Sequence, residues 1–404
     1  DRDTAALYRY DTSKRALGEL IAAHPRVDLT RGLVYDREKH RLVGLFYDAE
    51  RPGYAWFDDQ WASIARGVDA ALPDHMNMLS RGGDRVLVYS YSDIDPGTYY
   101  LLDLAARKLE PVVTVRSGIS PAKMPHREPF RYSARDGLSI PAYLTLPRGR
   151  EAKQLPLVVE VHGGPWVRGS EWHWDPEAAY LASLGYAVLQ PEFRGSTGWG
   201  RKSFEASWKQ WGRTMQDDLN DGVDDLVKRG IVDPSRVCIM GASYGGYAVM
   251  EALARDPDRW KCGVNWVGVT DIRYMFDVTW SDTWDSDWMK FSAKEMIGDP
   301  DKDAALLKAV SPLENASRIK APVLMAYGGL DRRVPAIHGE RMRDALTNHG
   351  VPVEWVLYGD EGHGFMVEAT RYDFYTRVAK FLDAQIGSGA NATRTSGDRT
   401  GPAR

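Results

Sequence analysis

The stretch Gly241-Ala242-Ser243-Tyr244-Gly245-Gly246 decides the fold because of what lies on either side of it. An apolar run over residues 236–240 precedes it, and an alanine-rich run over residues 248–255 follows it. This order predicts a buried strand, a tight turn and a helix, which is the setting of a G-x-S-x-G nucleophile elbow. Such a turn lifts the Ser243 hydroxyl above the carboxyl end of the sheet. The flanking glycines leave room for it because they lack a Cβ.

A serine hydroxyl is a poor nucleophile unless a base takes its proton, and His363 is the predicted base. It lies in a loop flanked by glycines, directly after the last apolar strand at residues 353–357. The predicted acid is Asp331, which follows the apolar strand at residues 323–327 and would orient the imidazole. The chain order Ser, Asp, His is the order of the α/β-hydrolase triad.

The oxyanion of an acyl-transfer intermediate needs two N–H donors. The turn points the N–H of Tyr244 at the place where the oxyanion would form. The loop His162-Gly163-Gly164-Pro165-Trp166 follows an apolar strand, and its Gly164 N–H is the second expected donor. We expect His162 to hold this loop by hydrogen bonds and not to act as a second base.

Two further acids, Asp360 and Glu361, are only two or three residues from His363. Within a turn they are poorly placed to reach the far ring nitrogen, so both are predicted to be solvated.

After a proline-containing connector at residues 121–129, strands and helices alternate as far as residue 386. The strands are nearly continuous apolar runs, which predicts a mostly parallel sheet with helices on both faces. We therefore expect an α/β-hydrolase domain over residues 121–386. The tail at residues 387–404 offers almost nothing to bury and is predicted to be disordered.

Residues 1–120 are predicted to form short strands with an internal repeat. The strand that begins at Arg41 and the turn at Gly53 both have counterparts 44 residues later, at Arg85 and Gly97. A period near 40–50 residues with several strands in each unit is typical of β-propeller blades, although an ordinary β-meander is the alternative. A propeller needs about four blades to close, and this segment has material for about two to three. We expect an incomplete propeller whose natural N-terminus is missing, with open strand edges that favour self-association or association with a missing propeller fragment.

Composition narrows the classes of function. The chain has 404 residues, 43% of them hydrophobic, and a net charge of −4, which gives no indication of a nucleic-acid partner. No apolar run reaches the 18 residues of a membrane span, and no signal peptide is visible. The expected compartment is left open between cytoplasm and periplasm. The two cysteines, Cys238 and Cys262, fall on consecutive predicted strands; buried free thiols are expected, with a disulfide as the alternative.

Taken together, five motifs resemble the prolyl oligopeptidase family, and above all its acylaminoacyl-peptidase and dipeptidyl-aminopeptidase branch. They are His162-Gly163-Gly164-Pro165, Phe193-Arg194-Gly195-Ser196-Thr197-Gly198-Trp199-Gly200, Gly241-Ala242-Ser243-Tyr244-Gly245-Gly246, Asp331-x-Arg333-x-Pro335 and Gly362-His363-Gly364. The resemblance covers about residues 125–386. It implies an α/β-hydrolase domain capped by a β-propeller, and serine-dependent hydrolysis of short peptides through an acyl-enzyme, without metal or cofactor.

The same resemblance suggests residues that bind substrate. Arg333 would contact a substrate carbonyl, the loop that carries Arg194 would lie near the site, and Trp166 is a further candidate. The incomplete propeller means that dipeptidyl, acylaminoacyl or single-residue specificity cannot be carried over.

Two other functions are compatible with parts of the sequence. A carboxylesterase would use the same triad on small esters. A non-catalytic binding module would predict a broken triad, and all three triad residues are present. In addition, Trp280, Trp284 and Trp288 recur at four-residue spacing, which predicts one stripe on a helix. We expect that stripe to pack in the core or between domains, or else to line an apolar substrate pocket.

Overall fold

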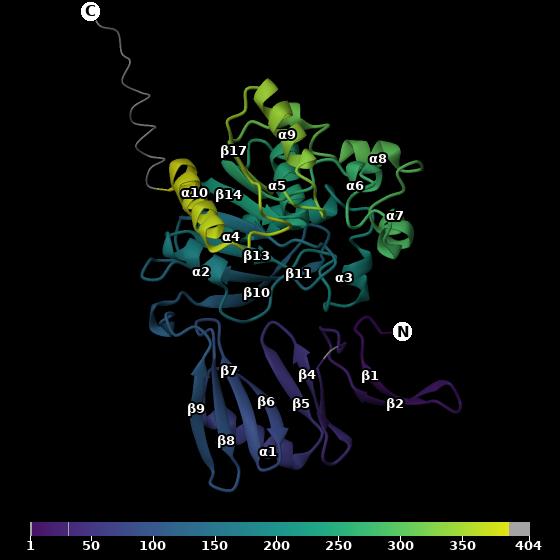
Figure 1. Ribbon diagram of the computed structural model, residues 1–404, viewed down its shortest axis with the longest axis vertical. Coiled ribbons are helices and arrows are strands. Elements are labelled where there is room, and N and C mark those ends of the chain that lie inside the picture. The colour runs from purple at the N-terminus through teal and green to yellow at the C-terminus, as the bar shows by residue number, and fades with distance from the viewer. Residues whose placement is uncertain (1, 31, 388–404) are drawn as a thin grey trace, which may run out of the picture.

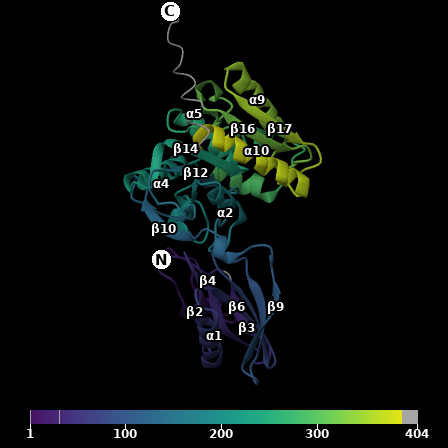
Figure 2. The ribbon, with the colours of Figure 1, turned by 90° about the vertical axis from the view of Figure 1, so that its left-hand side faces the viewer.

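The computed structural model describes residues 2–30 and 32–387, so the predicted disordered tail lies outside it except for Gly387. The molecule has two parts, one above the other (Figures 1 and 2). Following the predicted boundaries, we call residues 121–386 the hydrolase domain and residues 1–120 the propeller segment.

The hydrolase domain is built on one eight-stranded sheet in the order β10-β11-β13-β12-β14-β15-β16-β17. β11 pairs antiparallel with both β10 and β13, and every later pair is parallel. The strands are β10 (Arg127–Ser133), β11 (Ser139–Thr145), β12 (Leu155–Val161), β13 (Ala187–Pro191), β14 (Val232–Ala242), β15 (Cys262–Trp266), β16 (Val323–Gly328) and β17 (Val353–Tyr358).

Alternate side chains of the central strands enter two different cores, which is why these strands are apolar throughout. In β12, Leu157 and Val159 point into one core, and Val158 points into the other. Helices α4 (Thr214–Lys228), α5 (Tyr244–Arg255) and α9 (Ile337–Asn348) cover the first core, whereas α2 (Pro176–Ser183) and α10 (Glu368–Ile386) cover the second. The shorter helices are α3 (Arg201–Glu205), α6 (Tyr274–Asp277), α7 (Ala293–Met296) and α8 (Ala304–Ala309).

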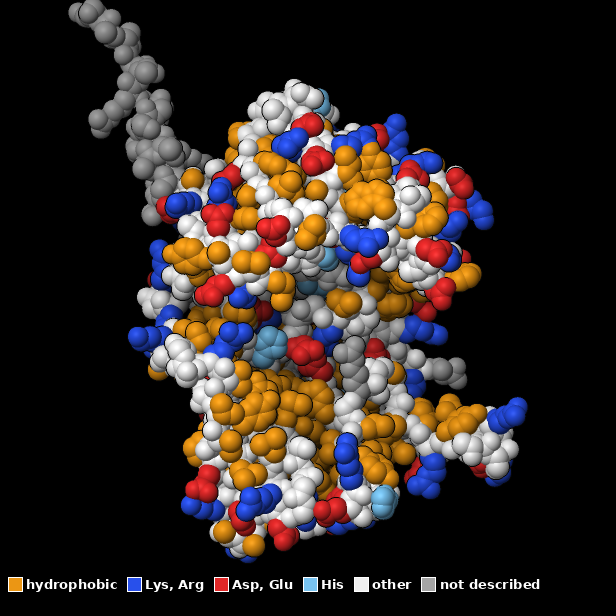
Figure 3. Space-filling model, viewed as in Figure 1, with side chains coloured by type: hydrophobic (Ala, Val, Ile, Leu, Met, Phe, Trp, Pro, Cys, Tyr) orange, Lys and Arg blue, Asp and Glu red, His pale blue; other side chains and the backbone are white. Residues whose placement is uncertain are grey.

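The described residues of the propeller segment form three small antiparallel sheets, as the strand and turn pattern predicts. The fold is thus an α/β hydrolase preceded by a β-propeller segment. The sheets are β1 (Leu7–Asp11) with β2 (Ala16–Ala22); β3 (Leu33–Asp36), β4 (Arg41–Asp48) and β5 (Pro52–Trp56); and β6 (Met76–Gly82), β7 (Arg85–Tyr91), β8 (Thr98–Asp103) and β9 (Lys108–Thr114). Apolar side chains gather on the surface of this segment just below the hydrolase domain (Figure 3).

One helix within the propeller segment was not predicted from the sequence. Helix α1 (Asp59–Ala71) lies between β5 and β6, and the Asp58 side chain caps it by accepting from the Trp61 N–H. Its buried residues Trp61, Ala65 and Val68 recur at helical spacing. They pack in one core with residues of the β3–β5 sheet and of the β6–β9 sheet. The spacing was visible in the sequence, but the stripe is only three residues long and lies inside a β-repeat.

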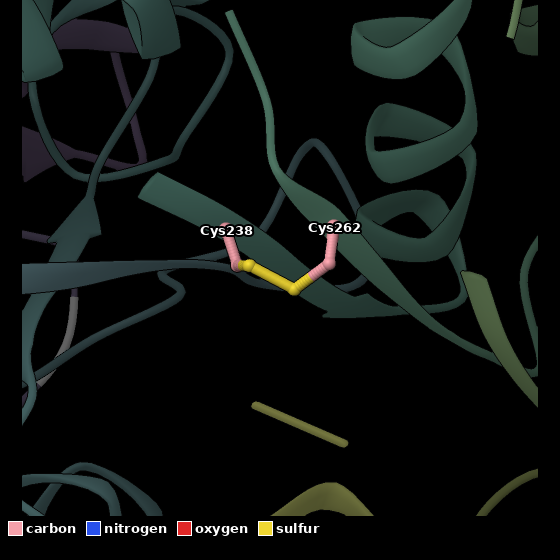
Figure 4. Close-up of a disulfide and its surroundings, with 2 residues drawn as sticks. All are labelled: Cys238 and Cys262. Carbon is pink, nitrogen blue, oxygen red and sulfur yellow. A yellow bond between two sulfur atoms is a disulfide. The ribbon is translucent and has the colours of Figure 1, made fainter. Parts of the chain in front are cut away.

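The expectation of two free thiols is wrong, because Cys238 and Cys262 form a disulfide (Figure 4). The two residues are direct partners in the parallel pair β14–β15, with their Cα atoms 4.8 Å apart. This separation lies within the range that a disulfide spans. The sequence shows which strands carry the cysteines but not the register that places them opposite each other.

None of the described helices is long and apolar enough to cross a membrane.

Candidate active site

Ser243 lies at a strained turn between β14 and α5. Its backbone has φ +59° and ψ −116°, a conformation that a residue with a side chain rarely adopts. The turn fits only because its neighbours are glycines. A Cβ on Gly245 would lie 2.0 Å from the Val161 carbonyl oxygen, and a Cβ on Gly241 would lie 2.7 Å from the same oxygen. The Ser243 side chain is therefore lifted out of the sheet.

Asp331 and His363 meet above the carboxyl end of the same sheet. Asp331 follows β16 and His363 follows β17, and His363 Nδ1 lies 2.8 Å from Asp331 Oδ2. The other carboxylate oxygen of Asp331 accepts the N–H groups of Arg333 and Val334 at 2.8 and 2.9 Å. Asp331 is 3% exposed, so its carboxylate is fixed and screened from water. Because Nδ1 faces Asp331, Nε2 is the nitrogen of His363 left to accept a proton.

Contacts through β15 connect the serine with the histidine loop. The Ser243 N–H donates to the Trp266 carbonyl at 3.0 Å. The Trp266 ring packs against Phe365, which is two residues after His363, with ring centroids 5.2 Å apart. The strands before Ser243, Asp331 and His363 are parallel members of one sheet, so the three side chains emerge at one edge.

The loop at residues 162–166 lies against the serine, as predicted. A Cβ on Gly163 would lie 3.2 Å from the Ser243 Cβ. Gly164 has φ +62°, which favours glycine. Within the described residues, the N–H groups of Gly164 and Tyr244 have no protein acceptor. Both donors are thus available to a bound group, which is what an oxyanion hole requires.

His162 makes contacts of the kind expected for a residue that holds this loop. Its Nδ1 lies 3.0 Å from the Gly163 carbonyl oxygen and its Nε2 lies 3.0 Å from the Ser196 hydroxyl. Its ring stacks on Phe193 with centroids 4.4 Å apart. In the neutral ring, Nδ1 therefore donates to the carbonyl and Nε2 accepts from the hydroxyl.

Of the two acids beside His363, Asp360 is exposed as predicted, but the prediction for Glu361 is wrong. Glu361 is 3% exposed, and its carboxylate accepts the N–H groups of Met366 and Val367, both at 2.9 Å. Neither acid replaces Asp331, which is the carboxylate that contacts His363. Asp360 faces solvent, and the Glu361 carboxylate holds the turn that follows the histidine.

Arg333 extends beside the triad, where it forms a two-point ion pair with Asp282. Its Nε and Nη2 donate to the two carboxylate oxygens of Asp282 at 2.7 and 3.0 Å. The Arg333 guanidinium lowers the pKa of Asp282, and the charge of His363 adds to this effect. Within the described residues, the other three of the five guanidinium N–H groups have no acceptor. Sequence reasoning missed Asp282, since nothing local links it to a residue 51 positions away.

The other two predicted substrate-binding residues differ from each other in their accessibility. Trp166 is half-buried, and its Nε1 donates to the Ser207 hydroxyl at 2.8 Å. Arg194 is 4% exposed, and its guanidinium pairs with Asp218 and Asp136, with shortest distances of 2.7 and 2.8 Å. Trp166 is therefore partly accessible, whereas Arg194 is buried and held by two carboxylates.

The predicted tryptophan stripe does not lie on one helix. Trp280 and Trp284 lie in an irregular segment after α6 and are 55% and 41% exposed. Trp288 begins a short π-helical turn, Trp288–Ser292, and its ring lies 6.0 Å from the ring of Trp166. The prediction of a helix from the four-residue spacing is wrong here, because the Asp and Ser residues between the tryptophans favour turns. Only Trp288 packs against the core.

No group of three or more metal-ligating side chains occurs among residues 2–30 and 32–387.

Comparison with known proteins identifies the family of the chain. The family model described as "Prolyl oligopeptidase family" matches residues 172–389. A dipeptidyl aminopeptidase BIII of Pseudoxanthomonas mexicana is 33% identical over 402 residues, covering 96% of this chain and 57% of that protein. An acylamino-acid-releasing enzyme of Sus scrofa is 30% identical, covering 65% of this chain and 36% of that protein.

Among solved structures, a puromycin-hydrolyzing peptidase of Mycobacterium tuberculosis superposes with a TM-score of 0.73 and 25% identity, over 88% of this chain and 53% of that one. The chain thus spans between about a third and three fifths of these relatives' lengths. The family model covers more than half of the chain, and we conclude that the chain belongs to the prolyl oligopeptidase family.

Proposed function

We propose that the protein is a serine peptidase that cleaves short peptides with the triad Ser243, His363 and Asp331. The observation that carries this proposal is the 2.8 Å contact between His363 and the buried Asp331, together with a serine in the strained elbow conformation at the same edge of the sheet. A surface serine or histidine has no need of such strain or of a buried acid, whereas an activated nucleophile needs both a base and a group that orients the base.

In this mechanism Ser243 attacks the carbonyl carbon while Nε2 of His363 takes the hydroxyl proton. Asp331 holds the ring and stabilises the imidazolium that forms. The N–H groups of Gly164 and Tyr244 bind the oxyanion. His363 then protonates the leaving amine, and water hydrolyses the acyl-enzyme by the same steps in reverse.

Short peptides are the proposed substrates because two relatives are named as a dipeptidyl aminopeptidase and an acylamino-acid-releasing enzyme. The free N–H groups of Arg333 are proposed to hold a peptide carbonyl, and Trp166 with Trp288 to form an apolar wall. Esters remain substrates of the same triad, since an ester needs no protonation of an amine leaving group. The ratio of amide to ester hydrolysis therefore separates a peptidase from an esterase.

The test of the triad is Ser243→Ala. We expect kcat to fall by about 10⁶-fold and labelling by a serine-directed phosphonate to stop, with the thermal unfolding midpoint nearly unchanged. Ser183→Ala is the control, since this exposed hydroxyl donates to the Tyr180 carbonyl and contacts neither the predicted base nor the oxyanion loop. Phosphonate attached to another serine in the Ser243→Ala protein would contradict the proposal.

Substrate class is tested by kcat/KM on matched anilides, free or blocked at the amino end, and on the corresponding esters. Turnover of free-amine anilides supports an aminopeptidase. Turnover of esters alone would assign the site to an esterase.

The Cys238–Cys262 disulfide supports maturation in an oxidising compartment such as the periplasm, which cell fractionation with thiol labelling would test. Self-association through open strand edges, or association with a separate propeller fragment, stays a prediction that light scattering would test. The domain boundaries at residues 120 and 386 also stay predictions.

A further inference from the structure

The loop that begins with Gly163 and Gly164 is fixed at its other end by a buried carboxylate. Glu192 is fully buried, and its two oxygens accept the N–H groups of Gly169 and Ser170 at 3.3 and 2.5 Å. The Nε1–H of Trp199 donates to the same carboxylate at 3.3 Å. Two backbone groups of the loop and one indole therefore share a single acceptor that solvent cannot replace.

The two ends of this loop also pack on each other. A Cβ on Gly169 would lie 2.0 Å from Cδ2 of His162, so the His162 ring rests directly on the Gly169 backbone. His162 in turn contacts the Gly163 carbonyl, and a Cβ on Gly163 would lie 3.2 Å from the Ser243 Cβ. A shift of the loop at Gly169 would thus be passed through one rigid ring to the residues beside the nucleophile.

The propeller segment reaches this arrangement through Arg168. The Arg168 guanidinium stacks on the Trp199 ring at 3.8 Å. It also donates to the Ala49 carbonyl at 3.2 Å and lies 3.7 Å from Asp48. Ala49 follows β4 and packs in one small core with Trp199 and Val27. Residues of the propeller segment and of the oxyanion loop therefore both pack against one indole.

We infer that Trp199 and Arg168 are positioning residues through which the propeller segment holds the proposed oxyanion donor Gly164 in place. The propeller segment would thereby contribute to turnover. This inference rests on the proposed function, because it concerns the geometry of the oxyanion hole. An oxyanion donor acts mainly on the transition state, so its displacement lowers kcat and leaves substrate binding nearly unchanged.

The test is Trp199→Phe, which keeps a ring for Arg168 but removes the Nε1–H that Glu192 accepts. Trp172→Phe is the matched control: Trp172 is also buried at the boundary between the two parts, and within the described residues its Nε1 has no hydrogen-bond partner. For Trp199→Phe we expect kcat to fall about tenfold on anilides and esters alike, with KM within twofold and a parallel drop in the rate of phosphonate labelling. The control should keep kcat within twofold of wild type.

A second pair of variants keeps the inference falsifiable if Trp199→Phe fails to fold. Arg168→Met removes the contacts with the Ala49 and Ser170 carbonyls and the ion pair with Glu192, 3.8 Å away, and should lower kcat in the same way. Arg168→Lys keeps the charge beside Glu192 and should recover part of the activity. An unchanged kcat in these variants, an equal loss in Trp172→Phe, or a rise in KM in place of a fall in kcat would overturn the inference. None of these outcomes would contradict the proposed function, which is tested separately: Ser243→Ala in the otherwise unchanged protein should abolish turnover.

Discussion

The strands of the hydrolase domain and those of the propeller segment bury their side chains in different ways. All six residues of β16 are buried, and β12 has only one residue that is partly accessible. By contrast, six of the seven residues of β9 are exposed, and five of seven in β2. A parallel sheet between two layers of helices fixes its strands from both faces, whereas a small antiparallel sheet is held from one. Ser243, Asp331 and His363 each follow a strand of the first kind of sheet.

The largest expected effect is a loss of kcat in Asp331→Asn, a change directly after a buried strand of the hydrolase domain. An amide N–H would face Nδ1 of His363 and leave Nε2 protonated, so the ring could no longer accept the Ser243 proton. We expect kcat to fall by about 10⁴-fold with little change in thermal stability. Asp360→Asn, in the exposed part of the histidine loop, is the control and should keep full activity. An Asp331→Asn enzyme within tenfold of wild type would remove Asp331 from the triad.

The disulfide makes the next largest predicted difference, and it stabilises only the hydrolase domain. Replacing both cysteines by alanine should lower the free energy of unfolding by about 3.5 kcal/mol, from the loop that a bridge between residues 24 apart closes. Chemical denaturation of the oxidised protein and of the double variant measures this difference. An equal effect of reductant on both proteins would show that the bridge contributes nothing.

The propeller segment can be weakened separately through its own small core. Val88 is fully buried there, beside Trp61 and Val43. Val88→Ala should cost about 2 kcal/mol. Because this core is separate from those of the hydrolase domain, hydrogen exchange should rise in β6–β9 and stay unchanged in β14–β16. A uniform rise across both regions would mean that they unfold as one unit and would break the comparison.

The smallest predicted effect, counted for each pH unit, concerns a buried acid on α5. Burial raises the pKa of Glu251 to about 8, and its Oε2 has no partner within the described residues. The folded state therefore holds a proton that the unfolded state releases above about pH 4.5. Stability should fall by about 1.4 kcal/mol for each pH unit until the pKa is reached. Glu251→Gln should remove this slope, as measured by denaturation at pH 5, 6 and 7, whereas Glu251 with an ordinary pKa would show no difference in slope.

The same contrast explains what the sequence could predict. Ser243, Asp331 and His363 each follow an apolar run that only a buried parallel strand accounts for, so their common edge was predictable. Helix α1 was missed because three apolar residues within a β-repeat are a weak signal. The disulfide depended on the register of β14 and β15, and the pairing of Arg333 with Asp282 on the course of an irregular segment. Both are set by tertiary packing and leave no local trace in the residues concerned.

The disulfide has a consequence for how this protein would respond to proteolysis. The 23 residues enclosed between Cys238 and Cys262 include the elbow, Ser243 and all of α5. A single cut anywhere in that segment would leave both fragments covalently joined. Gel electrophoresis without reductant would then show a chain of full mass, and only a reduced sample would reveal the break. A preparation that has lost its activity can therefore look intact unless the bridge is opened first.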